Sequence, residues 1–315
     1  MIPALVLTAG LATRLRPLSL VRAKAALPVA GEPLIHRILR WLAASGVSDV
    51  VLNLHHLPHT LTGVVGDGAE LGIRVRYSWE VPVLGSAGGP RRAIPILGAS
   101  TFFIVNGDTL TTFDLAALAH SHRHSGALVT MAVTTNTEPD KYGGVVTSHD
   151  SVVTGFVRRG SPKRSYHVVG VQVAEAAAFD AVPVDVPYES FGALYPALIA
   201  ERPGSVRVFH SSAEFYDIGT PSDYLETSLR LADRERQGVT FGRGTRVDPT
   251  ARVERSILWD DVVVEAGAMV TECVITDLVR VPADTSWRGV TMRVAHGELV
   301  PGETRIGELA VSSMR

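Results

Sequence analysis

The feature that most restricts the fold is an apolar residue that recurs every five or six positions in the last third of the chain. The pattern is carried by Val247, Val253, Leu258, Val264, Val270, Ile275 and Val281. The segment VDPTARVERSILWDDVV is repeated 17 residues later as VEAGAMVTECVITDLVR. This period is too long for a helix and too regular for a loop, so it predicts a three-sided parallel β-helix. Two full coils match; the alternative is an ordinary β-meander with fortuitous spacing.

The first half of the chain alternates buried strands with helices. Apolar runs at Ile2–Thr8, Val50–Leu54 and Phe102–Val105 predict strands, whereas Pro33–Ala44 and Leu115–Ser121 have apolar residues at helical spacing. Such alternation predicts a mostly parallel, Rossmann-like sheet with helices on its faces, an α/β fold. Ligands bind at the carboxyl ends of the strands in these sheets. We therefore expect the site in the loops after the first and third of these strands.

The middle of the chain predicts less regular elements that complete the sheet. Ala93–Leu97 is short and interrupted by proline, and further runs predict four strands and a helix: Gly144–Thr147, Ser151–Val157, Val168–Val173, Val206–His210 and, as the helix, Phe191–Glu201. Pro221–Gln237 predicts a helix with proline in its first turn and Gly238 at its end. We place the domain boundary there, with a catalytic domain at 1–237 and the β-helix at 238–315.

Composition excludes several classes of protein. With 30 basic and 32 acidic side chains, the chain lacks the excess of positive charge typical of nucleic-acid binders. Its single cysteine, Cys273, cannot form an internal disulfide. The apolar start has no basic segment before it, and no run reaches the roughly 18 apolar residues that span a bilayer. We expect a cytoplasmic protein that binds neither nucleic acid nor membrane.

The segment Leu7–Pro28 reads as an anion-binding loop that follows the first strand. Gly10 allows a tight turn whose backbone N–H groups suit phosphate oxygens. Arg14 adds a fork of donors, and Lys24 adds a compact positive charge. Neither the Walker A pattern nor the dinucleotide pattern GxGxxG occurs here. Taken on its own, the loop is better interpreted as a turn that carries exposed basic residues.

Two carboxylates stand at strand ends that lie far apart in the sequence. Asp108 follows a buried strand in Asn106-Gly107-Asp108, and Asp217 lies between a strand and a helix in YDIGTP. Mg²⁺ takes oxygen ligands and bridges phosphates, so these two residues could share one ion. A single aspartate in a turn is usually a cap, so neither residue is diagnostic alone.

Taken in order, these motifs resemble the sugar-1-phosphate nucleotidyltransferases. The order is the glycine loop with TRLRP, a lysine before LPVAGEPLI, then LGSAG, NGD, DIGTP and the hexad repeats. The similarity is greatest to the mannose-1-phosphate guanylyltransferase branch, which carries a left-handed β-helix tail. The resemblance implies a single in-line displacement in which a sugar 1-phosphate attacks the α-phosphorus of a nucleoside triphosphate and pyrophosphate leaves. It also implies Mg²⁺ and a homo-oligomer.

The resemblance assigns roles by position. Arg14 is the arginine that grips the β- and γ-phosphates, Lys24 neutralises charge near the α-phosphate, and Asp108 and Asp217 are the Mg²⁺ ligands. The nucleotide is expected to contact Thr8, Ala9, Gly10, Leu11, Ala12, Thr13, Glu80, Gly85, Ser86, Ala87, Gly88, Asn106 and Gly107. The sugar is expected to contact Tyr142, Gly143, Gly144, Arg159, Gly170 and Glu189.

Four departures from the family pattern leave the substrate open. Ala12 replaces a glycine, Lys24 stands between alanines instead of prolines, Arg158 replaces an acid, and Val168 replaces an asparagine. The triphosphate half is thus kept better than the sugar half. Glu80 could accept from either guanine or uracil, so GTP is favoured by the overall resemblance and UTP stays possible. The alternatives are a uridylyltransferase that acts on another hexose 1-phosphate and a non-catalytic subunit that binds a nucleotide sugar.

Overall fold

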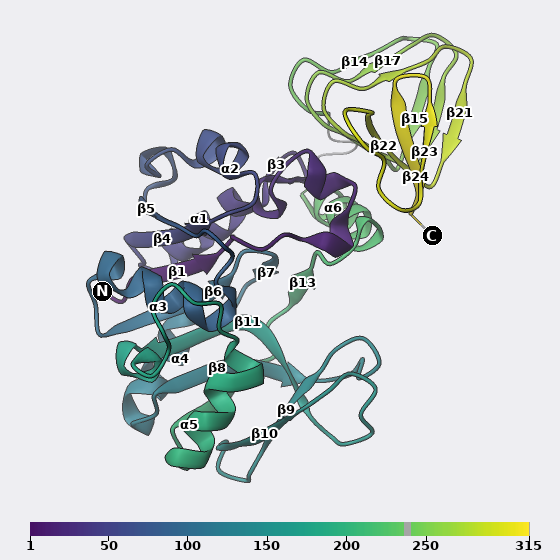
Figure 1. The fold of residues 1–315 in the computed structure, drawn as a ribbon. Coiled ribbons are helices and arrows are strands. Elements are labelled where there is room, and N and C mark those ends of the chain that lie inside the picture. The colour runs from purple at the N-terminus through teal and green to yellow at the C-terminus, as the bar shows by residue number, and fades with distance from the viewer. Residues whose placement is uncertain (236–240, 315) are drawn as a thin grey trace. The chain divides into compact units, whose positions relative to one another are not determined.

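The computed structural model describes residues 1–235 and 241–314, and Figure 1 shows its ribbon. The chain forms two compact units. The first contains Met1–Gly10, His36–Pro58 and Val65–Tyr216, and the second contains Leu11–Ile35, His59–Val64 and Asp217–Arg315. The domain boundary predicted at 237/238, and the helix end predicted at Gly238, lie outside the described residues. The boundary therefore stays a prediction.

The first unit is built on a nine-stranded sheet with a parallel half and a mostly antiparallel half. Strands β6, β1, β4 and β5 lie side by side in that order, and each pairs in parallel with its neighbour. Antiparallel β11 lies beside β6 and leads to the rest of the sheet. The bounds are β1 Ala4–Leu7, β4 Asp49–Leu54, β5 Arg74–Trp79, β6 Thr101–Asn106, β8 Val129–Thr135, β9 Gly144–Thr147, β10 Val153–Val157, β11 Tyr166–Glu175 and β12 Val206–His210.

Helices cover the sheet as the alternating pattern predicts. Helix α3 (Gly85–Leu97) contacts β1, β4 and β5, while α4 (Leu115–Ser125) contacts β8 and β11. The apolar side chains of α3 join the sheet in one core that includes Leu5, Phe102 and Ile104. Further elements before α6 are the helices α1 Leu34–Ala44, α2 Pro58–Val65 and α5 Tyr195–Glu201. Two ribbons of two strands each pair β2 Pro28–Val29 with β3 Glu32–Pro33, and β7 Thr109–Thr111 with β13 Phe215–Asp217.

Helix α3 is longer than its sequence predicts. The sequence predicts only the short, proline-interrupted segment Ala93–Leu97, yet the helix runs unbroken from Gly85 to Leu97. Its glycines and prolines are residue types that disfavour helices. The first turns of α3 lie so close to neighbouring segments that residues larger than glycine would clash at Gly88 and Gly89. A Cβ on Gly88 would lie 2.6 Å from the Val186 carbonyl oxygen, and one on Gly89 would lie 2.6 Å from Glu80 Oε1. Tertiary packing thus outweighs local propensity here.

The second unit contains the predicted parallel β-helix, which appears in Figure 1 as the stacked strands from β14 onward. Each face has three short parallel strands, and Val247 pairs with Val264, which pairs with Val281. The strands are β14 Arg246–Val247, β15 Arg252–Glu254, β16 Ile257–Leu258, β17 Val263–Val264, β18 Met269–Thr271, β19 Val274–Ile275, β20 Arg280–Val281, β21 Ser286–Arg288 and β22 Val290–Val294.

Within the described residues the β-helix forms three coils, one more than the two that the repeat predicts. Trp287 takes the position that valines hold in the earlier coils, pairing with Val270, and Met292 pairs with Ile275. These larger side chains hide the third repeat in the sequence. Antiparallel strands β23 (Glu303–Ile306) and β24 (Leu309–Ser313) then extend the face that ends in β22.

Helix α6 (Pro221–Arg234) has a complete N-terminal cap, formed by Thr220 and Asp223. The Thr220 hydroxyl accepts from the Asp223 amide at 3.1 Å, and Asp223 Oδ2 accepts from the Thr220 amide at 3.0 Å. Pro221 occupies the first turn, where its missing N–H costs no hydrogen bond. Within the described parts of the chain, every helix is too short or too polar to cross a membrane.

Candidate functional site

The first unit places two predicted loops at one edge of the sheet. Strand β6 follows β5 in the chain but pairs with β1 on the opposite side from β4, so the strand order reverses between β1 and β6. Leu7 pairs with Asn106 at the last position of both strands. The loops that begin at Thr8 and Gly107 therefore start side by side. Open α/β sheets bind ligands at such a point.

Close contact between these loops depends on Gly107. Its amide donates to the Leu7 carbonyl at 3.0 Å, and a Cβ there would lie 2.6 Å from that oxygen and 2.7 Å from Thr8 Cγ2. Asp108 comes next and is partly exposed, with the Thr109 hydroxyl 3.3 Å from its Oδ1. The predicted motif thus presents a carboxylate at the ligand edge of the sheet.

Gly170 reaches the same edge from the antiparallel side. The register of β11 against β8 shifts between Val168 and Gln172, and Gly170 within this bulge has φ +77°. A Cβ on Gly170 would lie 2.8 Å from Thr109 Oγ1 and 3.2 Å from the Asn106 Cβ. Glycine is required here for both reasons. The structure thus places Gly170 beside Asn106, although the resemblance assigns them to different ligands.

A buried asparagine, which the sequence analysis missed, organises the first loop. Asn53, on β4, is 3% exposed, and its Oδ1 accepts from the amides of Thr8 at 2.6 Å and Ala9 at 3.3 Å. The Thr8 hydroxyl donates to the Asn53 carbonyl. These bonds fix the start of the loop before Gly10. The signal in the sequence was a polar residue inside the apolar run VVLNL.

Glu80 is buried between Asn53 and the turn before α3. It is 1% exposed; its Oε1 accepts from Asn53 Nδ2 at 2.8 Å, and its Oε2 accepts from the Leu84 amide at 2.8 Å. Its position in the sequence predicts that this carboxylate accepts hydrogen bonds from a nucleobase. In the structure it holds Asn53 and the turn before α3 in place, so its contact with the first loop is indirect.

We expect Gly89→Ala to disturb this network. The added Cβ would lie 2.6 Å from Glu80 Oε1 and 3.0 Å from Asn53 Nδ2. Overpacking of this kind costs about 1–3 kcal/mol of unfolding free energy. Denaturant unfolding measures it, with Gly63→Ala as the matched control because no atom lies within 4 Å of a Cβ there. Equal stability of the two variants would contradict the network's role.

The start of α3 and the segment before α5 are held together by hydrogen bonds. The Ser86 hydroxyl donates to Glu189 Oε2 at 2.8 Å and accepts from the Ser190 amide at 2.8 Å. The amides of Ala87 and Gly88 donate to the Tyr188 carbonyl at 2.9 and 3.2 Å. The structure thus joins Gly85–Gly88, predicted to contact the nucleotide, to Glu189, predicted to contact the sugar.

Three further residues predicted to contact the sugar, Tyr142, Gly143 and Gly144, line an apolar cavity in the first unit. The cavity has a volume of about 260 Å³ and is lined by Tyr142, Gly143, Gly144, Val145, Phe156, Val157, His167, Val168 and Phe191. The His167 ring lies 4.2 Å from the Tyr142 ring. Burial, with the nearby charge of Lys141, lowers the pKa of His167 to about 4, so the imidazole is neutral at physiological pH. Arg159 is exposed, and its amide nitrogen is 3.7 Å from the Cβ position of Gly143.

The second unit contains the rest of Leu7–Pro28, the loop predicted to bind phosphate and called the phosphate loop below, and its turn is strained at Ala12. Ala12 has φ 47° and ψ 46°, the left-handed conformation that glycine usually supplies. Its carbonyl accepts from the Ser19 hydroxyl at 2.9 Å and from the Leu15 amide at 3.0 Å. Ala12, which stands where the family has glycine, therefore adopts the same left-handed turn, but this conformation is less favourable for alanine than for glycine.

Ala12→Gly is expected to raise the unfolding free energy by about 1 kcal/mol, the cost of a left-handed alanine. Thermal and denaturant unfolding test this expectation. The matched control is Ala9→Gly, which adds flexibility at a residue absent from the positive-φ positions. A destabilised Ala12→Gly variant would contradict it.

Arg14 and Asp217, both in the second unit, approach the same glycine. The Cβ position of Gly219 is 3.5 Å from Arg14 Nη1 and 3.5 Å from Asp217 Oδ2. Arg14 is exposed, as are Leu11 and Thr13 earlier in the same loop. Lys24 begins a short 3-10 turn, Lys24–Ala26, and the amide before it, Ala23 N–H, donates to Thr60 Oγ1 at 3.0 Å.

In the described residues, no group of three or more His, Cys, Asp or Glu side chains could hold a metal ion.

Comparison with known proteins agrees with this arrangement. A family model described as nucleotidyl transferase matches residues 3–234. The chain is 29% identical over 297 residues to the mannose-1-phosphate guanylyltransferase of Mycobacterium tuberculosis, covering 85% of this chain and 83% of that protein. It is 26% identical over 281 residues to the UTP–glucose-1-phosphate uridylyltransferase of Synechocystis sp., covering 83% and 72%. The structure of HddC from Yersinia pseudotuberculosis complexed with GMP-PN has a similar fold, with a TM-score of 0.64 and 23% identity, and covers 73% of this chain and 100% of that one.

Proposed function

Because the chain belongs to the nucleotidyl transferase family, we propose that it transfers a guanylyl group from GTP to a sugar 1-phosphate, with mannose 1-phosphate as the first candidate acceptor. The observation that carries the proposal is the family match over residues 3–234 together with a relative that is a mannose-1-phosphate guanylyltransferase. Arg14, Lys24, Asp108 and Asp217 are all present at the positions where the family motifs stand.

The proposed reaction is one displacement at phosphorus. A phosphate oxygen of the sugar 1-phosphate forms a bond to the α-phosphorus of GTP while the bond from that phosphorus to the bridging α–β oxygen breaks. The electron pair leaves with pyrophosphate, and the product is a GDP-sugar. No protein nucleophile takes part, so positioning and neutralisation of charge supply the catalysis.

Each charged residue has a proposed role in that step. Arg14 would hold the leaving phosphates with its planar fork of donors, and Lys24 would offset the charge that builds up at the α-phosphate. The loops at Gly10 and Gly107 would let the nucleotide approach the backbone at the end of β1 and β6. We propose that Arg159 contacts the sugar phosphate, since its backbone passes the apolar cavity at Gly143.

Asp108 and Asp217 have the chemistry that Mg²⁺ requires. Both side chains offer carboxylate oxygens, the hard ligands that this ion prefers, and both are partly exposed. When bound, the ion would neutralise phosphate charge and fix the triphosphate for in-line attack. Its usual mode, one or two carboxylates plus substrate phosphates, suits this donor set.

The apolar cavity and the Synechocystis relative motivate the second candidate, a uridylyltransferase that acts on another hexose 1-phosphate. Pyrophosphate release should be measured with GTP or UTP and with mannose or glucose 1-phosphate, each with Mg²⁺. We expect kcat/KM for GTP to exceed that for UTP by about tenfold or more, which corresponds to about 1.4 kcal/mol of discrimination. A preference for UTP would establish the second candidate instead. Saturable binding of a GDP-sugar without any pyrophosphate release would indicate a regulatory subunit.

We also propose that the chain works as a homo-oligomer through its β-helix. Exposed apolar residues on that domain, Met269 at 48% and Leu278 at 65%, support the proposal. Analytical ultracentrifugation tests it, and a monomer at micromolar concentration would count against it.

A further inference from the structure

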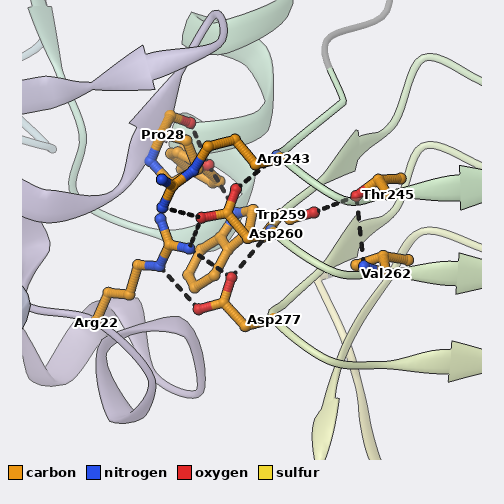
Figure 2. Close-up of polar contacts among 9 residues, drawn as sticks. Arg22, Pro28, Arg243, Thr245, Trp259, Asp260, Val262 and Asp277 are labelled. Carbon is orange, nitrogen blue, oxygen red and sulfur yellow. Dashed lines mark hydrogen bonds and ion pairs between the residues drawn. The ribbon is translucent and has the colours of Figure 1, made fainter.

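Arg22 anchors the phosphate loop to the β-helix within the second unit. Its Nε donates to Asp277 Oδ2 at 2.8 Å and its Nη2 donates to Asp277 Oδ1 at 2.6 Å, a two-point contact. The same Nη2 donates to Asp260 Oδ2 at 2.8 Å. Figure 2 shows the guanidinium between the two carboxylates. A planar fork that meets a carboxylate at two points fixes direction as well as distance.

The carboxylates belong to successive coils and are themselves held. Asp260 follows β16 and Asp277 follows β19, the next strand on the same face. Asp260 Oδ1 accepts from the Arg243 amide at 2.8 Å, and Asp277 Oδ1 accepts from the Asp260 amide at 3.0 Å. Their side chains are only 23% and 21% exposed, and that of Arg22 is 15% exposed. The site is therefore a built, rigid receptor for one arginine.

An aromatic contact strengthens the same anchor. The Arg22 guanidinium carbon lies 5.2 Å from the centre of the Trp259 ring, and Trp259 is fully buried. Trp259 Nε1 donates to the Tyr224 hydroxyl at 3.0 Å, and that hydroxyl donates to the Pro28 carbonyl. The β-helix thus holds the loop at two places, directly at Arg22 and through α6 at Pro28.

These two places flank Lys24. Arg22 lies two residues before it and Pro28 four residues after it. Burial alone would lower the pKa of Arg22, but the hydrogen bonds and charges of Asp277 and Asp260 raise it, so the guanidinium stays charged. The family resemblance assigns no role to Arg22, Asp260 or Asp277, and the proposed reaction does not use them.

We propose that Arg22 is a positioning residue for Lys24, so that the β-helix, through Asp260 and Asp277, sets the geometry of nucleotidyl transfer. This proposal rests on the proposed function. An anchor that only stabilised the fold would lower the unfolding free energy without acting through Lys24. If Arg22 acts by positioning Lys24, then replacing Arg22 should no longer slow the reaction in a variant that already lacks the Lys24 side chain.

A double-mutant cycle separates these two cases. Arg22→Met keeps the length of the side chain but removes the fork, and it is made in the full chain with Lys24 intact and with Lys24→Met. With Lys24 present, we expect Arg22→Met to lower kcat/KM for GTP by about 30-fold, and with Lys24→Met by less than about threefold, because contacting groups that act as a unit are not additive. Arg22→Lys keeps the charge but not the fork, so it should recover only part of the activity.

Arg243→Met is the matched control. Arg243 Nη2 lies 3.6 Å from the same Asp260 carboxylate, but its side chain is 94% exposed and it belongs to the β-helix itself. We expect this variant to keep wild-type kinetics within about twofold, as exposed ion pairs contribute little. An equal loss in Arg243→Met would show that any change at this cluster disturbs the fold, and would overturn the proposal.

The other outcomes are equally decisive. Additive effects of Arg22→Met and Lys24→Met, or a folded Arg22→Met variant with wild-type kcat/KM, would overturn the positioning role. Should Arg22→Met not fold, Asp277→Asn takes its place in the cycle, since it removes one charge and keeps the shape.

Should the wild-type chain release no pyrophosphate, the proposed function fails. Hydrogen exchange at the Ala26 and Leu27 amides, which close the turn at Lys24, then decides whether Arg22 anchors the loop: faster exchange in Arg22→Met supports the anchor and unchanged exchange overturns it.

Discussion

Replacing Asp108 or Asp217 with asparagine should lower kcat/KM for pyrophosphate release by about a thousandfold. Removing a group that stabilises charge developing on the phosphates in the transition state typically has an effect of this size. Asparagine keeps the size of the side chain but removes the charge that binds Mg²⁺. Asp108 stands where the strand order reverses, and Asp217 ends β13, so both are set by strands and the fold should persist. Rates measured across a series of Mg²⁺ concentrations should also show weaker dependence on the ion in both variants.

Asp185→Asn is the control for these carboxylates. Asp185 pairs with Arg92 in the first unit, and its side chain is 54% exposed, so its loss should change activity by less than about twofold. Wild-type activity in either Asp108→Asn or Asp217→Asn, with circular dichroism unchanged, would refute the metal assignment for that residue. Chelation of divalent ions should abolish turnover of the wild-type chain, and addition of Mg²⁺ should restore it.

Arg14→Met and Lys24→Met are the second pair with a large expected effect. Each removes a charge from the proposed triphosphate site, which should cost about 100- to 1,000-fold in kcat/KM. Arg14 would contact the leaving phosphates before and during reaction, so its loss should raise KM for GTP as well. Lys24 would act on charge that develops at the α-phosphate, so its loss should fall mainly on kcat.

Arg16→Met provides the control for both. Arg16 is exposed like Arg14 and lies two residues after it in the same loop. The control should keep KM and kcat within about twofold of wild type, as surface substitutions usually do. An Arg14→Met variant indistinguishable from Arg16→Met would contradict the role given to Arg14.

Much of the first unit follows from local pattern. The apolar runs at the first and third strands predict β1 and β6, and their pairing at Leu7 and Asn106 places the expected loops together. The hexad spacing predicts the β-helix because each coil repeats one strand per face. Trp287 conceals the third coil, since the repeat is read from aliphatic residues alone.

What the sequence does not reveal are contacts between distant residues. Arg22 is separated from Asp260 by 238 residues and from Asp277 by 255, and no local pattern connects them. Glu80 shows the same difficulty: its position suggests a ligand contact, whereas its partners, Asn53 and Leu84, bury it. Helix α3 forms because Gly88 and Gly89 allow close packing, which helix propensity alone cannot anticipate.

The central claim is nucleotidyl transfer from GTP to a sugar 1-phosphate, and phosphorus NMR of the reaction tests it most directly. With GTP, mannose 1-phosphate and Mg²⁺, the proposed reaction yields equal amounts of pyrophosphate and a GDP-sugar, while the signals of both substrates fall together. Unchanged GTP with every sugar 1-phosphate and nucleotide supplied, or conversion to GDP and orthophosphate, would contradict the claim.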